Sequence, residues 1–291
     1  MNYTITHRTI YDYPAAVSAS FHAARFEPQT FEGQKCTDFE LRVWPAPAVQ
    51  KVRTDYFGNR VSFFSIQEMH RRLEVSARSR VAVKAATPPA LALSEPWEKV
   101  RERFRDPVSP ADVQPYEFCL DSPLIMATPQ LADYAKASFP VGVPALVGVR
   151  DLARRIFREF KYDPRATTVA TPIDEVFRKR AGVCQDFAHI AIASLRSLGI
   201  PARYVSGYLR TVPPPGKERL VGADASHAWF AAYCPQQGWL EFDPTNDLLV
   251  GEDHIRVAVG RDFSDVSPLS GILTGGGEHE VNVSVDVKPE G

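Results

Sequence analysis

The sequence contains little cysteine and no excess of charge of either sign. Four cysteines are scattered over 291 residues, too few for the dense disulfide framework of a small secreted domain. Lysine and arginine together number 34, against 35 aspartates and glutamates, and no run of five or more like charges occurs. Binding to nucleic acid or to an anionic membrane surface through bulk charge is therefore excluded.

Long hydrophobic runs are also missing. No segment reaches the roughly 18 consecutive apolar residues of a membrane span, and residues 1–8 contain no apolar stretch of the signal-peptide type. We therefore expect a cytoplasmic protein with no membrane partner. A reducing compartment would keep its thiols reduced.

Closely spaced metal ligands are the third absence. Cys36, Cys119 and Cys234 stand alone, and neither a Cys-x-x-Cys nor a His-x-x-x-His spacing occurs. An Asp-rich calcium loop is lacking as well. We expect no metal and no cofactor.

One cysteine occupies a position suited to a nucleophile. Residues 184–198 are predicted to form a helix, because apolar residues such as Phe187 and Leu195 recur at helical spacing and Gly199 follows as a stop signal. Cys184 then lies in the first turn, where unpaired N–H groups and the helix dipole favour a thiolate. The same N–H groups can bind a developing oxyanion. A buried structural cysteine is the alternative.

A predicted hairpin supplies a histidine and an aspartate. Residues 226–233 and 239–243 read as two strands joined by a turn that contains proline and glycine. His227, near the start of the first strand, can therefore lie beside Asp243, at the end of the second. In that arrangement a carboxylate orients an imidazole and stabilises the imidazolium. The alternative is a capping histidine and an unrelated turn aspartate.

Three nearby groups are predicted to have other roles. His189 comes five residues after Cys184, so at about 3.6 residues per turn it points away from the thiol. Asp186 is expected to stabilise the N-terminus of the helix. Tyr162 is a candidate for an additional oxyanion donor.

The rest of the chain divides by its hydrophobic pattern. Residues 1–88 alternate apolar and polar side chains between turn signals, which predicts a β-sandwich-like domain. Residues 89–145 are predicted to be a helical connecting region, in which Ser94 caps the first helix. Residues 146–250 combine helices with antiparallel strands, as in an α+β thiol enzyme. Residues 251–291 end in a strand of alternating valines, which we expect to pack on the N-terminal domain.

Four segments resemble the transglutaminase-like superfamily of papain-related folds, in its bacterial branch. They are Gly182–His189, Leu198–Tyr208, Ser226–Trp229 and Asp243–Asn246. The N-terminal third, including Asp55–Asn59, resembles the β-rich domain that precedes the core in that branch. The resemblance implies an α+β, papain/transglutaminase-like core of helices and antiparallel sheet behind a β-sandwich-like domain. It also implies that Cys184 is the nucleophile, His227 the general base and acid, and Asp243 the residue that orients His227.

The resulting hypothesis is a thiol peptidase or amidase. Cys184 attacks a peptide or carboxamide carbonyl, His227 protonates the leaving amine, and water resolves the acyl-thioester. A protein-glutamine transglutaminase, in which an amine resolves that thioester, is one alternative. A non-catalytic peptide-binding module on the same fold is another. The expected partner is a peptide or protein substrate, and a homo-oligomer is left open.

Overall fold

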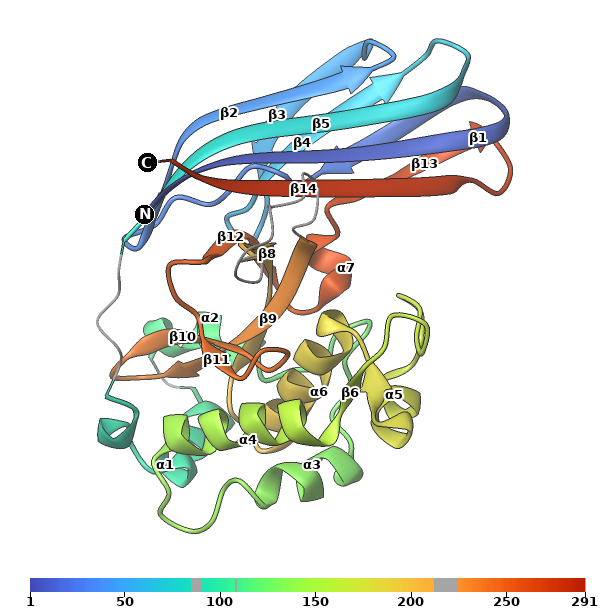
Figure 1. Ribbon diagram of the computed structural model, residues 1–291. Helices are drawn as coiled ribbons and strands as arrows, with labels where there is room; N and C mark the ends of the chain where they lie inside the picture. The colour runs from blue at the N-terminus through green and yellow to red at the C-terminus, as the bar shows by residue number, and fades with distance from the viewer. Residues whose placement is uncertain (85–89, 108, 212–224, 291) are drawn as a thin grey trace, which may run out of the picture.

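The computed structural model describes residues 1–84, 90–107, 109–211 and 225–290. Figure 1 shows a large sheet lying across one end of a second unit, which combines a smaller sheet with the helices. The predicted α+β class, with a β-rich region ahead of a core of helices and antiparallel strands, is confirmed. The expected boundary at 88/89 lies outside the described residues.

The large sheet is built around one long strand. Its members are β1 (Asn2–Ala24), β2 (Gln34–Trp44), β3 (Val49–Thr54), β4 (Arg60–Ile66), β5 (His70–Val83), β13 (Leu269–Gly275) and β14 (Glu280–Glu290). The order is β2-β5-β1-β4-β3, and β13 and β14 also pair with β1. The first part of β1 pairs with β5 and β14, and the part from Val17 onward pairs mainly with β4 and β13. The two ends of the chain therefore lie side by side (Figure 1).

Alternation along these strands divides the large sheet into two faces. In β1, the side chains of Tyr3 and Ile5 are buried, and they share one hydrophobic core with the helices. Val285 and Val287 of β14 join the same core, so both ends of the chain pack onto the second unit. Asn59, in the turn before β4, pairs with the second unit as a strand would. Its side chain accepts from Val259 N and donates to Val259 O, both at 2.8 Å.

The smaller sheet is entirely antiparallel. Its order is β11-β10-β9-β8-β12. The strands are β8 (Ala202–Leu209), β9 (Ala225–Cys234), β10 (Gly238–Asp243), β11 (Leu248–Leu249) and β12 (His254–Gly260). The predicted hairpin is confirmed as β9 and β10, with Phe230 opposite Phe242. Two short strands, β6 (Lys161–Tyr162) and β7 (Ala181–Gly182), form a separate parallel pair.

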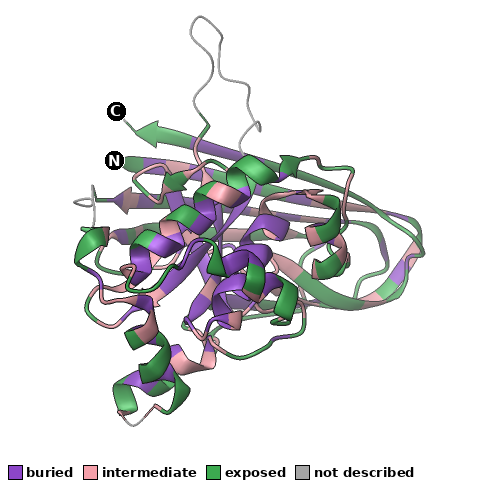
Figure 2. Cartoon of the chain, turned by 90° about the horizontal axis from the view of Figure 1, so that it is seen from below, coloured by how far each residue is buried: buried purple, intermediate pink, exposed green. Residues whose placement is uncertain are grey.

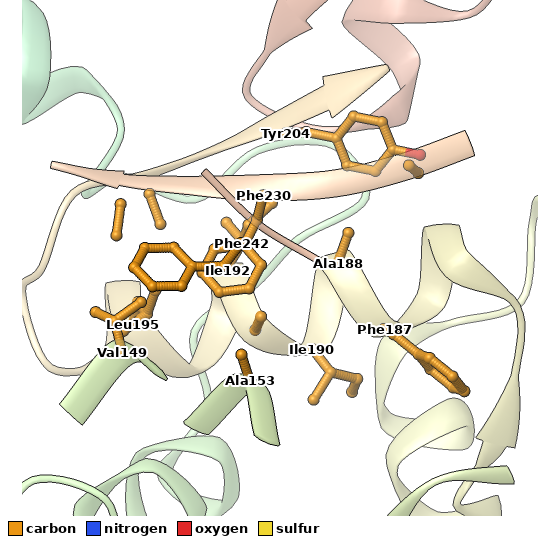
Figure 3. Close-up of a cluster of buried hydrophobic side chains, with 14 of the residues drawn as sticks. Val149, Ala153, Phe187, Ala188, Ile190, Ile192, Leu195, Tyr204, Phe230 and Phe242 are labelled. Atoms are coloured by element: carbon orange, nitrogen blue, oxygen red, sulfur yellow. The ribbon is translucent and has the colours of Figure 1, made fainter. Parts of the chain in front are cut away.

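Helix α6 lies at the centre of the second unit. Figure 3 shows Ile192 and Leu195 of this helix beside Phe230 and Phe242 of the sheet, with Val149 of α4 nearby. The helical elements are η1 (Leu91–Leu93), α1 (Trp97–Arg105), α2 (Pro110–Glu117), α3 (Pro129–Lys136), α4 (Ala145–Glu159), α5 (Ile173–Lys179), α6 (Cys184–Ser197) and α7 (Phe263–Val266). Buried segments gather in the middle of the molecule in Figure 2, and exposed ones on its outer helices. Burying each large apolar side chain contributes about 1.5–3 kcal/mol, which anchors α6 in place.

One predicted helix cap is wrong. The residue that caps α1 is Pro96, not Ser94. The Ser94 hydroxyl instead donates to Leu91 O at 2.7 Å and accepts from Leu146 N at 3.1 Å, so it links η1 to the start of α4. Within the part of the chain described, no helix has both the length and the apolar character needed to cross a membrane.

Candidate active site

Cys184 is the first residue of α6, as the sequence predicts. The parallel pairing of β6 with β7 brings the chain into this helix through Gly182. The predicted capping role of Asp186 is confirmed, because its Oδ2 accepts from Val183 N at 2.8 Å and from the Thr167 hydroxyl at 2.6 Å. The N–H groups of the first helical turn have no acceptor within the helix, so they surround the thiol with donors.

Only glycine fits at position 182. A Cβ atom there would lie 2.4 Å from Oδ2 of Asp186, well inside van der Waals contact. The close approach of the carboxylate to the backbone is what lets Asp186 cap the helix that carries Cys184. Gly182 therefore affects Cys184 indirectly, because it allows the tight turn from which α6 begins.

His227 lies near the start of β9 and is buried, with 8% of its surface exposed. Its Nε2 donates to Oδ2 of Asp243 at 2.8 Å, and the side chain of Cys184 lies close enough to interact electrostatically with the imidazole. Because Nε2 is engaged by the carboxylate, Nδ1 is the nitrogen that serves the thiol. The structure thus joins His227 to Asp243 by a hydrogen bond and places Cys184 next to the imidazole.

The protonation of His227 follows from these contacts. Burial alone would lower the pKa of His227, but the hydrogen bond to Asp243, the adjacent Cys184 side chain and the charges of both groups raise it to about 10. The imidazole is therefore protonated at neutral pH.

Asp243 receives five hydrogen bonds. Its Oδ2 accepts from His227, from Nε2 of His254 at 3.1 Å and from Nδ2 of Asn246 at 2.7 Å. Its Oδ1 accepts from the backbone N–H groups of Thr245 and Asn246. Burial would raise the pKa of Asp243, but these bonds, led by those from the two histidines, hold it far below its ordinary value. The carboxylate is thus charged and held in one orientation.

Sequence reasoning missed His254 and assigned no role to Asn246. Asn246 stands three residues after Asp243, at the end of the segment Asp243–Asn246. This spacing is a local signal for a turn that folds back on the aspartate. His254 has no comparable signal. It reaches Asp243 because β12 lies next to β8 at the edge of the smaller sheet, an arrangement set by tertiary structure.

The same cluster contains one potential metal-ligand set. His227, Asp243 and His254 each offer one ligand atom, and these atoms lie within 4.8 Å of one another. Atoms that bind one tetrahedral zinc ion through bonds of about 2.0–2.2 Å lie roughly 3.3–3.6 Å from one another. The carboxylate oxygen instead lies 2.8 Å and 3.1 Å from the two ring nitrogens, which are hydrogen-bond distances. Hydrogen bonding thus accounts for this cluster.

The remaining predicted residues lie outside the Cys184–His227–Asp243 chain. His189 is buried against Tyr204 and accepts from Phe263 N at 3.3 Å, and burial lowers its pKa to about 4, so it is neutral. Burial raises the pKa of the Tyr162 phenol, and the charge of the nearby Cys184 raises it further. Its role as an oxyanion donor stays a prediction.

Comparison with known families matches two parts of the chain. Residues 3–82 match the bacterial transglutaminase-like N-terminal region, and residues 142–244 match the core of the transglutaminase-like superfamily. The second match contains Cys184, His227 and Asp243 and ends one residue after the aspartate.

Relatives cover the chain nearly end to end. An uncharacterised protein of Mycobacterium tuberculosis is 43% identical over 99% of this chain and 92% of its own length. A protein-glutamine gamma-glutamyltransferase of Pseudomonas aeruginosa is 36% identical, over 32% of this chain and 15% of that protein. The crystal structure of a candidate cysteine protease from Cytophaga hutchinsonii has a TM-score of 0.74 and 22% identity, covering 100% of this chain and 92% of that one.

Proposed function

Because this chain belongs to the transglutaminase-like superfamily, we propose that it is a thiol-dependent peptidase or amidase with Cys184, His227 and Asp243 as its catalytic residues. The observation that carries the proposal is the buried hydrogen bond from the His227 imidazole to the Asp243 carboxylate, with Cys184 next to that imidazole at the start of α6. A nucleophile, a base within reach of it and a third group that orients the base are the components of covalent acyl transfer.

The acylation step uses the thiolate and the first turn of α6. Sγ of Cys184 forms a bond to the carbonyl carbon of the substrate, and the carbonyl oxygen becomes an oxyanion. Backbone N–H groups at the start of α6 stabilise that charge, since they have no acceptor within the helix. The intermediate then collapses, the C–N bond breaks, and the leaving amine takes the proton from Nδ1 of His227. An acyl-thioester on Cys184 remains.

Deacylation reverses the proton path. His227, now neutral, removes a proton from water as the water oxygen attacks the thioester carbon. The C–S bond breaks and the carboxylic acid product leaves. Throughout the cycle Asp243 stays ionised, because its five donors favour the charged form. It stabilises the imidazolium without accepting the proton.

Transfer of the acyl group to an amine is the second candidate. It is supported by the relative from Pseudomonas aeruginosa, which is named as a protein-glutamine gamma-glutamyltransferase and is 36% identical over 102 residues. The two reactions share the thioester and differ only in the acceptor. We favour water because it requires no second binding site.

The deciding experiment follows the fate of the acyl group. The protein is incubated with unfolded casein and a labelled primary amine, and the products are identified by mass spectrometry. Free carboxylates without label are expected, and labelled glutamine side chains would instead assign the transferase. Cys184→Ala should lower turnover by at least about 10³-fold. The control, Cys36→Ala, removes another free thiol far along the chain and should retain full activity.

Two further results would contradict the proposal. One is turnover by Cys184→Ala equal to that of the unaltered protein. The other is the failure to trap any thioester on Cys184, by mass spectrometry of the acid-quenched reaction, with either acceptor present. The second result would favour the peptide-binding module.

We further propose that the protein works in a reducing compartment, the cytoplasm. All four cysteines are free thiols, and Cys184 must stay reduced to act. Detection of the tagged protein in fractionated cells tests this, and recovery outside the cytoplasm would overturn it.

A further inference from the structure

A cavity of about 380 Å³ lies where the large sheet meets the smaller one. The large-sheet unit contributes Thr30, after β1, and Arg60, at the start of β4. The smaller sheet contributes Arg203 of β8 and Arg256 of β12. Figure 1 shows β8 and β12 directly beneath the large sheet. Among the residues described, Cys184, His227 and Asp243 do not line this cavity, so it is separate from the candidate active site.

The three arginines of this cavity differ in how their charges are balanced. Arg60 lies 3.5 Å from Glu27, and Arg256 lies 2.6 Å from Glu241. The side chain of Arg203 forms no hydrogen bond or ion pair with any described residue, and its Nε is buried without an acceptor. Its guanidinium is stacked on the ring of Trp239 at 4.3 Å. A guanidinium offers five N–H donors, and leaving even one of them buried without an acceptor is costly.

Arg203 and Arg256 together have one carboxylate between them. Glu241 attracts both arginines electrostatically, and the positive charges of Arg203 and Arg256 repel each other. Burial, aided by this repulsion, lowers the pKa of Arg203 to about 10, so it remains protonated at neutral pH. Nε of Arg256 is likewise buried without an acceptor. Two partly buried cations next to one carboxylate leave a deficit of one negative charge.

We propose that this cavity binds a small oxyanion, a phosphate or a carboxylate, with Arg203 as its principal ligand. An oxyanion supplies the missing negative charge and acceptors for the buried N–H donors of both arginines. The Thr30 hydroxyl adds a neutral donor, since its oxygen already accepts from Cys36 N at 3.1 Å and its proton is available. The volume is in the range of small-molecule sites.

The site joins parts of the chain that are distant in sequence. Thr30 and Arg60 belong to the first 60 residues, and Arg203 and Arg256 to the core, so a bound anion would hold the two units together. Arg256 is also connected to the candidate active site through two side chains, Glu241 and Trp229. Its partner Glu241 accepts from the indole of Trp229 at 2.8 Å, and that ring lies 5.9 Å from the ring of His227.

Titration calorimetry on the full chain tests the proposal. Inorganic phosphate and succinate are titrated separately at constant ionic strength set with sodium chloride, and the tighter probe identifies which oxyanion the site prefers. One saturable event per chain is expected. Arg203→Gln should weaken it at least tenfold, which corresponds to about 1.4 kcal/mol. The control Arg165→Gln removes an arginine whose side chain is 93% exposed and should bind as the unaltered protein does.

The outcomes separate cleanly. The proposal is overturned if neither probe binds saturably to the unaltered protein, or if Arg203→Gln binds as tightly as Arg165→Gln. Arg203→Lys is the variant to be titrated if Arg203→Gln fails to fold. It keeps the charge but loses the planar fork, so it should bind more weakly than the unaltered protein. Binding of undiminished strength by Arg203→Lys, with the glutamine variant unfolded, would also count against Arg203 as the principal ligand.

Discussion

Asp243 is the residue on which the hydrogen bonds of the candidate active site converge. Two histidines from different strands donate to the same oxygen, His227 from β9 and His254 from β12. The second histidine is a positioning residue, because it touches the carboxylate and not the thiol. Holding the carboxylate in place in turn holds the imidazole that acts on Cys184.

We expect His254→Phe to lower kcat by about 10–100-fold, with little change in KM. A hydrogen bond to a charged group contributes about 1.5–3 kcal/mol, and its loss weakens the orientation of His227. The pH profile of kcat/KM should shift as well, since Asp243 loses one of the donors that lower its pKa. His254→Gln, which keeps an N–H donor, should recover part of the loss. An unchanged pH profile in His254→Phe would reduce His254 to a packing role.

The contacts of His227 also predict how stability depends on pH. Its pKa rises from 6.5 to about 10 in the folded protein, so folding favours the protonated form. The resulting stabilisation is fully present below pH 6.5 and is lost as the pH rises toward 10. The difference in free energy of unfolding between the unaltered protein and His227→Gln should therefore shrink across that range. Urea unfolding at pH 6, 8 and 10 measures it, and a difference that grows with pH would contradict the assignment.

At the scale of elements, we expect the turn that precedes α6 to be especially sensitive to substitution. Gly182→Ala places a methyl group against the Asp186 carboxylate and must displace that cap. We expect a loss of about 1–3 kcal/mol in the free energy of unfolding, and slower alkylation of Cys184 by iodoacetamide. Gly251→Ala is the matched control, because a Cβ there meets no atom within 4 Å. Equal stability and equal alkylation rates for the two variants would show that the turn tolerates a side chain.

Elements specified by local pattern could be predicted, and those specified by packing could not. The apolar spacing after Cys184 predicted α6 to within one residue of its observed end, and the aromatic strands predicted the β9–β10 hairpin. Ser94 was expected to cap α1 but bonds Leu146 N, a group 52 residues away that no local pattern reveals. His254 escaped notice for the same reason, since its hydrogen bond to Asp243 depends on strand order in the sheet. The stacking of Arg203 on Trp239 depends on strand order as well.

At the scale of the whole molecule, the two ends of the chain share the core of the second unit. Val287 of β14 is fully buried there, and Val283 of the same strand is 53% exposed. Val287→Ala should lower the free energy of unfolding by about 1–3 kcal/mol, through lost burial and the cavity left behind. Val283→Ala should change it by less than about 0.5 kcal/mol. Thermal unfolding of both variants tests this, and equal effects would mean that β14 is not anchored by its buried face.

The pairing of β1 with β14 also constrains how the protein is made. The first part of β1 pairs with β5, which follows it closely in sequence, and with β14, which is synthesised long after it. Until then Tyr3 and Ile5 lack part of the apolar surface that covers them. Pairing across so long a separation is slow, and an unpaired strand edge is prone to aggregate while it waits. The large sheet is therefore completed only after β14 has been synthesised, and the nascent chain must be kept soluble until then.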